Sequence, residues 1–404
     1  MLKNPDFITA RDLLLDVVRT VDSEELALEE CFGRVLAESV MACENVPPFD
    51  RSPYDGYALR SEDTAEASRE APVTLRIIEE VPAGAVPTKL CTKGTAVKIL
   101  TGAPIPAGAD AVINYERTEF TETDVKLFAP IKRGENIVRT GEDVCKGDVL
   151  VRQGQIVDPG TAGTLAAQGV ARPKVYRRPK VGVISTGNEV IEVGTPLVPG
   201  KIYNSNRFTL SAALREIGCE SVYLGLAGDS LDAISELIKQ GITECDAIVT
   251  TGGVSVGDYD FTPDAMEQAG VNILLRGVQL KPGMACAYGE KDGKLVCGLS
   301  GNPASSLTNF YVVAVPALKK LAGLNDYLPE EIHVTLNEDF KKKSPATRLL
   351  RGKLDLSNST VQMKLPKDQG NVVISSAIGC DGMAIVPAGT GPLSSGTTLK
   401  GFKL

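Results

Sequence analysis

Two kinds of hydrophobic pattern occur along the chain, and each predicts a different secondary structure. Residues 9–22 repeat apolar side chains at the spacing of an amphipathic helix, and a second helix is expected at residues 158–168. Between residues 45 and 145 the apolar runs become short and are separated by glycine and proline. Regularly spaced short strands of this kind are typical of a small barrel or sandwich.

The pattern between residues 181 and 321 alternates strand and helix. Repeated strand–helix units predict a doubly wound α/β domain, in which a parallel sheet carries helices on both faces. The expected elements are strands at 181–185, 221–227 and 247–251, a β-rich stretch at 271–299, and helices at 207–217, 231–242, 262–269 and 303–321. After residue 323 only strands are expected, at 333–336, 361–365, 372–375 and 383–386, which indicates a C-terminal β-barrel or sandwich.

The composition argues against several classes of function. The 404 residues include 51 acidic and 43 basic side chains, so the broad basic face that nucleic-acid binding needs is not expected. Nine cysteines without a CxxC pair are typical of a reducing compartment, and a cytoplasmic location is therefore predicted. Since the sequence has no run of about 18 apolar residues, no membrane span is expected either.

The single histidine of the chain, His333, limits the possible chemistry. A catalytic Ser/His or Cys/His pair and a metal site built from several histidines are not expected. Any metal ion should therefore bind among carboxylates and phosphates, which favours Mg²⁺ as the cofactor.

Four polar loops follow the predicted strands of the α/β region. Ligands of doubly wound sheets bind beyond the carboxyl ends of the strands, so these loops should share one edge of the sheet. Asn302 is a suitable helix cap and Pro303 suits the first helical position, which brings a helix N-terminus, favourable for phosphate, to this edge. The loops match neither the Walker A nor the GxGxxG pattern. The expected substrate-binding residues are Ser185, Thr186, Gly187, Gly252, Gly253, Val254, Ser255, Ser300, Gly301, Asn302 and Pro303.

Acidic side chains share the same predicted edge, namely Glu189, Asp229, Asp258 and Asp260. Carboxylates repel a nearby phosphate unless a cation lies between them, and Mg²⁺ binds one or two carboxylates together with phosphate oxygens. Glu189 and Asp260 are the predicted metal ligands. Asp229 is equally well explained as the cap of the helix that follows it.

Lys281 is the expected basic residue of this region, because a lysine before Pro-Gly lies in a turn and can point into a cleft. Of three further loops, the one at 47–58 mixes aromatic, acidic and turn-forming residues, and those at 100–106 and 139–143 are polar and rich in glycine. Periodicity alone does not show whether they meet the α/β edge.

Together these motifs resemble those of the molybdopterin molybdenumtransferase family, which includes MoeA and the E domain of gephyrin. The resemblance covers nearly the whole chain, and the set is far more specific than any single glycine turn. The motifs are FDRSPYDGYA at 49–58, TGAP at 101–104, GED at 141–143, STGNE at 185–189, IYNSN at 202–206, TGGVSVG at 251–257, KPG at 281–283 and GNP at 301–303.

The resemblance implies a multidomain chain of the α/β plus β class and a homodimer. The expected domains are a mixed α/β linking domain from 1–44 and 146–178, a β-rich domain at 45–145, a doubly wound MogA-like α/β domain at 179–324 and a C-terminal β-barrel at 325–404. The site would form between the α/β domain of one subunit and N-terminal loops of the other.

The activity implied by the resemblance is the insertion of molybdate into adenylated molybdopterin, with release of AMP and with magnesium assisting. A molybdopterin adenylyltransferase and apo-molybdoenzymes are implied as further partners. By position in the family motifs, Arg351 resembles an arginine that helps to hold molybdate. The implied catalytic residues are Asp55, Thr101, Asp143, Asp229 and Lys281.

The chain also departs from the family pattern. Met284 stands where many relatives have a lysine, so one cation is missing, and Asn371 stands roughly where others have a serine. Two other functions stay open. A molybdopterin adenylyltransferase shares the α/β domain but lacks the flanking regions, and a scaffold of the gephyrin type binds partners without catalysis.

Overall fold

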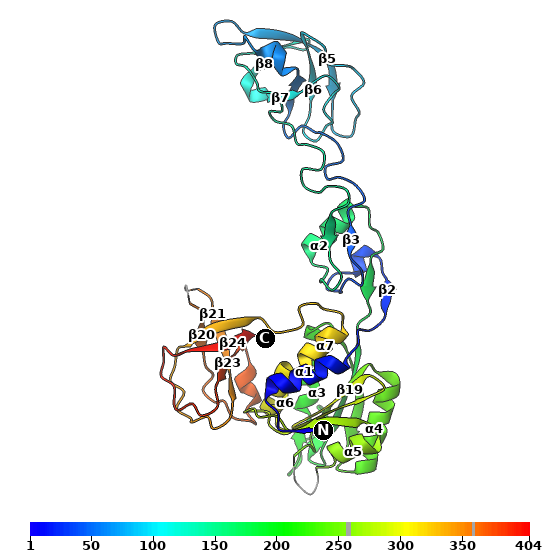
Figure 1. Cartoon of the computed structure of the whole chain (residues 1–404), viewed down its shortest axis with the longest axis vertical. Coiled ribbons are helices and arrows are strands. Elements are labelled where there is room, and N and C mark those ends of the chain that lie inside the picture. The colour runs from blue at the N-terminus through cyan, green and yellow to red at the C-terminus, as the bar shows by residue number, and fades with distance from the viewer. Residues whose placement is uncertain (256–259, 358–359) are drawn as a thin grey trace. The chain divides into compact units, whose positions relative to one another are not determined.

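The computed structural model of the chain describes residues 1–255, 260–357 and 360–404. The chain divides into two compact units (Figure 1). The first comprises Met1–Glu38, Gln153–Ala162 and Arg172–Leu404, and the second comprises Ser39–Arg152 and Gly163–Ala171. The predicted α/β and C-terminal β regions both belong to the first unit. The finer division into four domains stays a prediction.

A seven-stranded sheet forms the centre of the α/β part, in the order β1-β17-β18-β19-β16-β12-β15. Four neighbouring strands are parallel, namely β15 (Glu220–Ala227), β12 (Lys180–Thr186), β16 (Ala247–Thr251) and β19 (Lys294–Leu299). The hairpin partner β18 (Cys286–Lys291) runs antiparallel to β19 and to β17 (Asn272–Arg276), and β1 (Leu2–Lys3) pairs with β17 at the edge. The doubly wound fold is confirmed, although the complete sheet is mixed rather than parallel.

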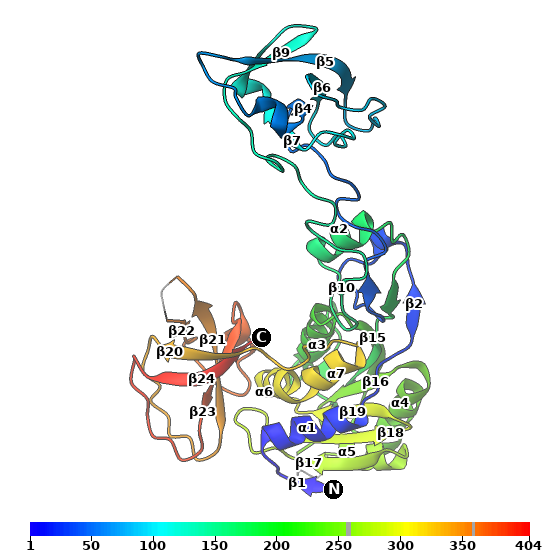
Figure 2. The ribbon, with the colours of Figure 1, turned by 45° about the horizontal axis from the view of Figure 1, so that its top comes forward.

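Helices cover both faces of this sheet (Figure 2). One face carries α1 (Phe7–Val17), α3 (Ser205–Glu216) and the segment formed by α6 (Pro303–Asn309), η4 (Phe310–Ala314) and α7 (Val315–Leu321). The opposite face carries α4 (Leu231–Glu244) and α5 (Thr262–Gln268). Because both faces are covered, β16 is buried at every residue, as strands of parallel sheets generally are.

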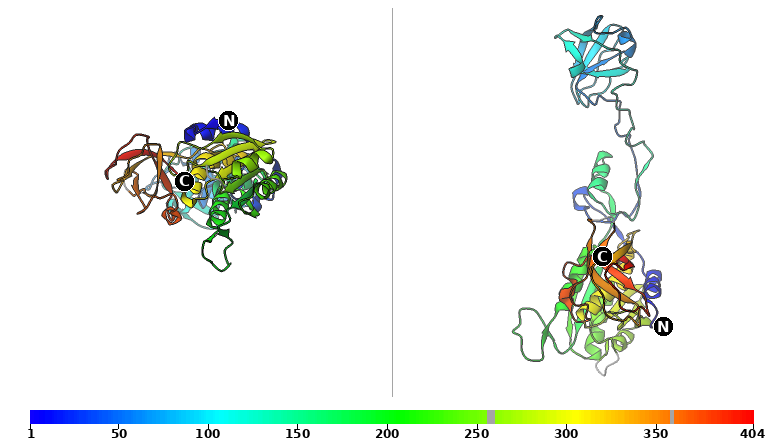
Figure 3. Two further views of the ribbon diagram at one scale, coloured as in Figure 1. Left: turned by 90° about the horizontal axis from the view of Figure 1, so that it is seen from below. Right: turned by 90° about the vertical axis from the view of Figure 1, so that its left-hand side faces the viewer.

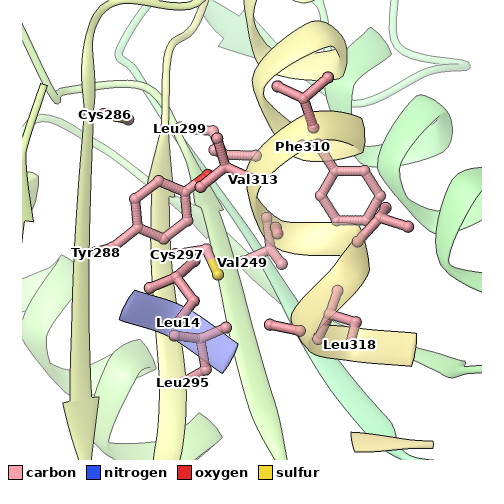
Figure 4. Close-up of a cluster of buried hydrophobic side chains, with 14 of the residues drawn as sticks. Leu14, Val249, Cys286, Tyr288, Leu295, Cys297, Leu299, Phe310, Val313 and Leu318 are labelled. Atoms are coloured by element: carbon pink, nitrogen blue, oxygen red, sulfur yellow. The ribbon is translucent and has the colours of Figure 1, made fainter. Parts of the chain in front are cut away.

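The main apolar core lies between the sheet and the α1 face (Figure 4). Leu14 of α1, Tyr288 of β18 and Phe310 of η4 meet there, and all three side chains are fully buried. The core includes residues from the N-terminal helix and from the C-terminal barrel as well as from the α/β segment. Segments far apart in the sequence are therefore joined in one unit by shared apolar contacts.

The C-terminal part is a closed five-stranded barrel next to the α/β part (Figure 3). Its strands are β20 (Glu331–Leu336), β22 (Gln362–Lys364), β21 (Arg348–Asp355), β23 (Gly382–Val386) and β24 (Thr398–Lys403). β21 and β24 were not expected from the sequence. The strand predicted at 372–375 is wrong, because this segment contains the 3₁₀ helix η5 (Ile374–Ala377).

The second unit contains a six-stranded sheet, as the β-rich pattern predicts. Its order is β7 (Ala111–Asn114), β4 (Gly56–Leu59), β6 (Thr95–Ile99), β5 (Val73–Val81), β9 (Asp124–Leu127) and β8 (Thr118–Phe120). Short pairs elsewhere join β3 (Val40–Met41) to β10 (Val149–Val151), β2 (Ser23–Glu25) to β11 (Lys174–Tyr176), and β13 (Val190–Ile191) to β14 (Ile202–Tyr203). The predicted helix near residue 158 is α2 (Pro159–Ala167).

Two predicted helices end or change earlier than their apolar patterns suggest. α1 stops at Val17 because Val18 adopts extended backbone angles. The helix predicted at 303–321 contains the π-helical turn η4, so its register shifts between α6 and α7. Within the described residues, every helix is too short or too polar to span a bilayer.

Candidate functional site

The strand order places a natural ligand crevice at the carboxyl ends of β12 and β16. Chain connections leave β12 toward β15 on one side and return to β16 on its other side. Such a reversal opens a crevice at the strand ends. A cavity of about 560 Å³ lies there, and every residue of the loops that was predicted to bind substrate lines it. The loops thus come together as predicted, and their individual roles stay predictions.

Three carboxylates line this cavity, those of Glu189, Asp229 and Asp260. No lysine or arginine of the described ranges lines it, and Asp258 lies outside those ranges. A phosphate placed here would meet negative charge without a basic side chain to offset it. A cation bound together with the ligand would offset the repulsion between the phosphate and these carboxylates.

The donor set fits Mg²⁺ bound together with a phosphorylated ligand. Among the described residues no three His, Cys, Asp or Glu side chains are gathered closely enough to hold a metal ion by themselves. Magnesium is usually bound through one or two carboxylates, with substrate phosphates supplying other ligands. Glu189 and Asp260, both on the cavity wall, provide such a partial set.

Asp229 is not the cap of the helix that follows it. Ser230 takes that role, since its side chain accepts a hydrogen bond from the amide of Ala233 at the start of α4. Asp229 instead faces the loop after β12, where its Oδ2 accepts from the amide of Asn188 at 3.1 Å. Asn188 Oδ1 accepts in return from the Asp229 amide at 3.2 Å. The reciprocal pair fixes the Asp229 backbone at the cavity wall.

Gly252 allows the loops after β12 and β16 to touch. Its φ is +105°, and a Cβ there would lie 2.4 Å from Thr186 Oγ1 and 2.8 Å from the Thr186 carbonyl oxygen. Only glycine tolerates both the backbone angle and the contact. Gly301 continues the contact, because its own Cβ would lie 3.6 Å from the Cα of Gly252.

Two asparagines of the cavity wall were not named as site residues from the sequence, although they belong to the IYNSN motif. Asn206 is buried, and its Nδ2 donates to Thr251 Oγ1 at 2.8 Å and to the Gly301 carbonyl oxygen at 2.9 Å. Asn204 Oδ1 accepts from Ser185 Oγ at 3.0 Å. These contacts tie three ligand-facing loops to the start of α3. The sequence feature that could have indicated them is the pair of asparagines, two residues apart, at the start of a helix.

The N-terminus of α6 lies at the cavity, but two of its amides already have partners. The amides of Ala304 and Ser305 both donate to the carbonyl oxygen of Asn371, at 3.1 and 3.2 Å. Asn302 occupies the cap position without a side-chain cap bond. We expected this helix end to offer free amides to phosphate. For Ala304 and Ser305 that expectation is wrong, because their amides are bound by a loop of the barrel.

Arg351 of β21 is the largest fully buried side chain, with 1% exposure. Its Nη1 donates to Thr308 Oγ1 at 3.0 Å and its Nη2 donates to Ser376 Oγ at 2.9 Å, while Nε has no partner. Burial lowers the pKa of the Arg351 guanidinium. A buried cation bonded to hydroxyls rather than to a carboxylate favours an anion nearby.

Lys281 does not line the cavity at the strand ends. Its loop pairs with the barrel instead: the Lys281 amide donates to the Thr347 carbonyl oxygen at 2.9 Å, and the Leu349 amide donates to the Lys281 carbonyl oxygen at 2.8 Å. Lys281 and Arg351 therefore both lie at the seam between the α/β part and the barrel. Ser376, which contacts Arg351 there, was not named from the sequence, because no local pattern relates it to β21.

One barrel segment, residues 371–376, connects the cavity to this seam. Asn371 caps α6, Val372 lines the cavity, and Ser376 contacts Arg351. The cavity and the buried guanidinium are thus neighbours along a continuous stretch of backbone.

The remaining predicted residues, Asp55, Thr101 and Asp143, belong to the second unit. Asp55 Oδ1 accepts from the amide and from Oγ1 of Thr101, both at 2.7 Å. The amide hydrogen bond and then the hydroxyl hydrogen bond lower the pKa of the Asp55 carboxyl. The Asp143 amide donates to the Val46 carbonyl oxygen at 3.0 Å.

The three polar loops of the second unit come together. The backbone of Arg51 pairs with Pro104 and with Val138, and the Gly141 amide donates to the Pro47 carbonyl oxygen at 3.0 Å. Asp50 anchors the third loop, because it accepts from Arg139 Nη1 at 2.6 Å and from the Thr140 amide at 2.8 Å. The motifs at 49–58, 101–104 and 141–143 therefore form one polar surface.

Comparison with known proteins identifies the family of the chain. A protein of Staphylococcus aureus strain MRSA252 named molybdopterin molybdenumtransferase is 37% identical over 94% of this chain and 91% of its own length. A protein of the same name from Staphylococcus epidermidis strain RP62A is also 37% identical, over 93% of this chain and 90% of its own length. The chain belongs to the MoeA family. The resemblance seen in the motifs is confirmed.

Family models and solved structures agree with the MoeA assignment. Residues 6–169 match the MoeA N-terminal region (domain I and II), residues 182–320 match a probable molybdopterin binding domain, and residues 333–401 match the MoeA C-terminal region (domain IV). A molybdopterin biosynthesis MoeA protein of Pyrococcus horikoshii OT3 is 32% identical, with a TM-score of 0.86 over 99% of this chain and all of that chain. The predicted multidomain fold and the predicted transferase class are confirmed.

Proposed function

We propose that this MoeA-family chain inserts molybdate into adenylated molybdopterin and releases AMP, with Mg²⁺ assisting. The supporting observation is a cavity of three carboxylates without a described basic side chain, joined by residues 371–376 to a buried guanidinium. The cavity suits the phosphates of a nucleotide that arrives with a cation, and the guanidinium suits an oxyanion. The relatives named molybdopterin molybdenumtransferase support the same assignment.

In the nucleotide half of the site, Glu189 and Asp260 would hold Mg²⁺. The ion would supply positive charge between these carboxylates and the phosphates and polarise the phosphorus. The loops at Thr186, Gly252 and Gly301 touch each other and present a rigid wall to the ligand. Such fixed loops orient the bound phosphates and reduce the entropy lost on reaching the reactive geometry.

In the oxyanion half, Arg351 provides a fixed positive charge. A guanidinium has five N–H donors in one plane, and the hydrogen bonds to Thr308 and Ser376 leave others, including Nε–H, for an anion. Lys281 would add a second, more mobile charge from the neighbouring loop. These two cations would hold molybdate where relatives have an additional lysine in place of Met284.

Residues of the second unit complete the proposal. We propose a homodimer in which Asp55, Thr101 and Asp143 of one subunit face the cavity of the other. Sedimentation should then show a dimer. A mixture of the inactive variants Asp55→Asn and Asp260→Asn should regain about a quarter of the wild-type activity after subunit exchange, since half of the dimers would carry one intact site. Recovery of no activity from mixed dimers would contradict shared sites.

The experiment that tests the proposed reaction is a measurement of AMP release from adenylated molybdopterin in the presence of molybdate and Mg²⁺. Asp260→Asn should lower the rate by about 100-fold, because the charge between phosphate and protein is no longer balanced. Asp232→Asn, which changes an acid of α4 outside the cavity, is the matched control and should keep the rate.

Three results would refute this assignment. Unchanged Mg²⁺-dependent AMP release in Asp260→Asn would remove the role of that residue. Consumption of ATP with formation of adenylated molybdopterin would indicate an adenylyltransferase. Tight binding of partner proteins without any turnover would indicate a scaffold.

A further inference from the structure

Two consecutive polar residues of α6, Thr308 and Asn309, are buried among apolar side chains of the main core. Their exposures are 0% and 1%. A polar group in such surroundings destabilises the fold unless it is hydrogen-bonded. Its hydrogen-bond partners therefore indicate the structural role of the side chain. Two of the partners lie on elements outside this helix, β21 and the loop at 281–283, and each of those elements carries one cation of the proposed oxyanion site.

Thr308 holds the arginine. Its hydroxyl donates to the carbonyl oxygen of Ala304 at 2.7 Å and accepts from Nη1 of Arg351 at 3.0 Å. The hydroxyl is thus satisfied as donor and acceptor at once, which fixes its rotamer. Because α6 is seated in the core, Arg351 is held at a set distance from the helix axis.

Asn309 holds the loop that carries the lysine. Its Nδ2 donates to the carbonyl oxygen of Gly283 at 2.6 Å, and its Oδ1 accepts from the hydroxyl of Tyr288. Figure 4 shows the Tyr288 ring extending from its strand toward the helix that carries Phe310 and Val313. The Tyr288 bond orients the amide of Asn309 so that its NH₂ group faces the loop at 281–283.

The loop also touches α6 directly at Gly283. A Cβ on Gly283 would lie 3.0 Å from Cβ of Asn309 and 3.1 Å from the carbonyl oxygen of Ser305, and its φ is +111°. The backbone two residues after Lys281 therefore has no room to move toward the helix. Hydrogen bond and contact together fix this end of the loop.

Consecutive residues of a helix point about 100° apart, so neighbours can reach two different elements. Thr308 reaches the barrel and Asn309 reaches the loop before β18. The π-helical turn η4 begins at the next residue, Phe310. Such turns often occur at functional sites, where they alter which side chains face a neighbour.

We propose that Thr308 and Asn309 are positioning residues that set the separation between Arg351 and Lys281, and thereby the affinity and size preference for the tetrahedral oxyanion. The inference rests on the proposed function. Neither residue contacts the oxyanion. Each acts through a cation-bearing element: α6 holds Arg351 and the end of the loop after Lys281 from one side, while Lys281 itself is paired to β21 by backbone hydrogen bonds.

The test uses full-length protein and the AMP-release assay, with molybdate and adenylated molybdopterin varied separately. Thr308→Val keeps the shape but removes the hydroxyl, and Asn309→Leu removes the amide. Each should raise KM for molybdate by about 10-fold, since a bond that orients a cation is lost, while kcat and KM for adenylated molybdopterin change by less than about 3-fold. Thr308→Ser keeps the hydroxyl and should restore KM for molybdate.

A second readout is direct binding of molybdate by calorimetry, with sulfate as a smaller tetrahedral competitor. Preference for molybdate over sulfate should fall in Thr308→Val and Asn309→Leu and return in Thr308→Ser. Ile238→Val, a core change on the opposite face of the sheet, is the control for a general loss of stability and should leave both KM values unchanged.

The outcomes separate the two proposals. Molybdate-dependent AMP release in the wild type with an unchanged molybdate KM in both variants would overturn the positioning role alone. The same conclusion follows if Thr308→Ser behaves like Thr308→Val, or if Ile238→Val raises the molybdate KM equally. A wild-type protein that neither binds molybdate nor releases AMP with it would overturn the proposed function and this inference together.

Discussion

Glycine at position 252 is required by the side chain behind it. Thr186 passes directly against the Cα of Gly252, and the hydroxyl of Thr186 donates to the Thr251 carbonyl oxygen at 3.2 Å. The ligand-facing loop is therefore backed by a packed side chain rather than by solvent. A change at this single position acts on the shape of the cavity and on stability at the same time.

Gly252→Ala should destabilise the protein by about 1–3 kcal/mol and abolish detectable AMP binding, because the new Cβ meets Thr186 at a φ that alanine rarely adopts. Denaturant unfolding and calorimetry with AMP and Mg²⁺ measure the two effects. Gly194→Ala is the matched control, since Gly194 has a φ of +93° but no atom within 4 Å of a Cβ. It should lose stability without losing AMP binding, and equal loss of binding in both variants would contradict the contact argument.

Asp246 and Arg177 form a bidentate ion pair at the start of β12 and β16. Arg177 Nη1 and Nη2 each lie 2.6 Å from a carboxylate oxygen of Asp246, and the Lys180 amide donates to Asp246 at 2.8 Å. Burial alone would raise the pKa of Asp246, but the hydrogen bonds from Arg177 and Lys180 outweigh it and lower the pKa. The ion pair links Arg177, just before β12, to Asp246, just before β16.

A depressed pKa in the folded state makes this contribution dependent on pH. It is fully present above the unfolded value of about 3.9 and is lost as the pH falls through the lower folded value. Asp246→Asn should therefore cost about 2 kcal/mol at pH 7, because a partly buried arginine loses its partner, and less at pH 3, which lies below the unfolded pKa. Urea unfolding at both pH values measures the difference.

The control for this prediction is Glu236→Gln, which removes the exposed Lys239–Glu236 pair of α4. An exposed pair of this kind contributes less than about 1 kcal/mol, so its removal should have little effect at either pH. A cost for Asp246→Asn that is equal at pH 7 and pH 3 would show that the lost charge is not responsible.

Among the elements, the N-terminal helix α1 shows how packing determines a role that the sequence pattern leaves open. Its apolar spacing predicts an amphipathic helix, but the pattern does not say which sheet the helix covers. In the structure α1 packs against η4 and α7 in the main core, and β1 before it pairs with β17. The first residues of the chain are thus part of the α/β unit.

Leu14→Ala tests this packing, because Leu14 is fully buried in α1. The substitution should destabilise the first unit by about 2–5 kcal/mol through lost burial and a residual cavity. Ile8→Ala in the same helix removes a side chain that is 48% exposed and should change stability by less than about 1 kcal/mol. Denaturant midpoints of the two variants measure the contrast, and similar midpoints would mean that α1 is not docked in solution.

The local sequence pattern was sufficient to predict most helices and strands of the α/β part, but it was insufficient to predict all strands of the barrel. β16 carries no charged side chain and is buried at every residue because both faces of its sheet are covered, so its sequence is consistent with its burial. β21 carries Arg348, Arg351 and Lys353, and these charges hide its strand pattern. Tertiary contacts, such as the hydrogen bond from Arg351 to Thr308 of α6, explain why a charged residue occurs there.

The cavity could be predicted from the sequence, whereas the seam between the α/β part and the barrel could not. Its loops follow directly after strands of one sheet, so the strand order brings Thr186, Gly252 and Gly301 together by rule. The seam joins a loop, a helix and a barrel strand that no periodicity relates to one another. Ser376 and Thr308 could be found as partners of Arg351 only from their positions in space.

The whole molecule contains separate apolar cores for its two units. The clusters around Leu14, Ile238 and Val334 consist of first-unit residues, and the clusters around Tyr57 and Val97 consist of second-unit residues. Each of these five clusters lies within one unit. Units with separate cores generally unfold as separate cooperative blocks.

Scanning calorimetry should therefore resolve two thermal transitions. Leu14→Ala should lower the Tm of one, and Ile113→Ala, which truncates a buried residue of the second unit, should lower the Tm of the other. AMP with Mg²⁺ at about 100 times Kd should stabilise the first by about 2.7 kcal/mol, since the cavity is formed by first-unit residues. A single transition that both variants shift equally would contradict separate unfolding.

The segment at 371–376 makes the C-terminal barrel a poor candidate for exchange between distant relatives. It closes the end of α6 through Asn371, supplies Val372 to the cavity, and supports Arg351 through Ser376. A chimera that takes the barrel from one protein and α6 from another would mismatch all three. Recombination within the family should therefore succeed most often when its crossover points keep α6 and the barrel from the same parent.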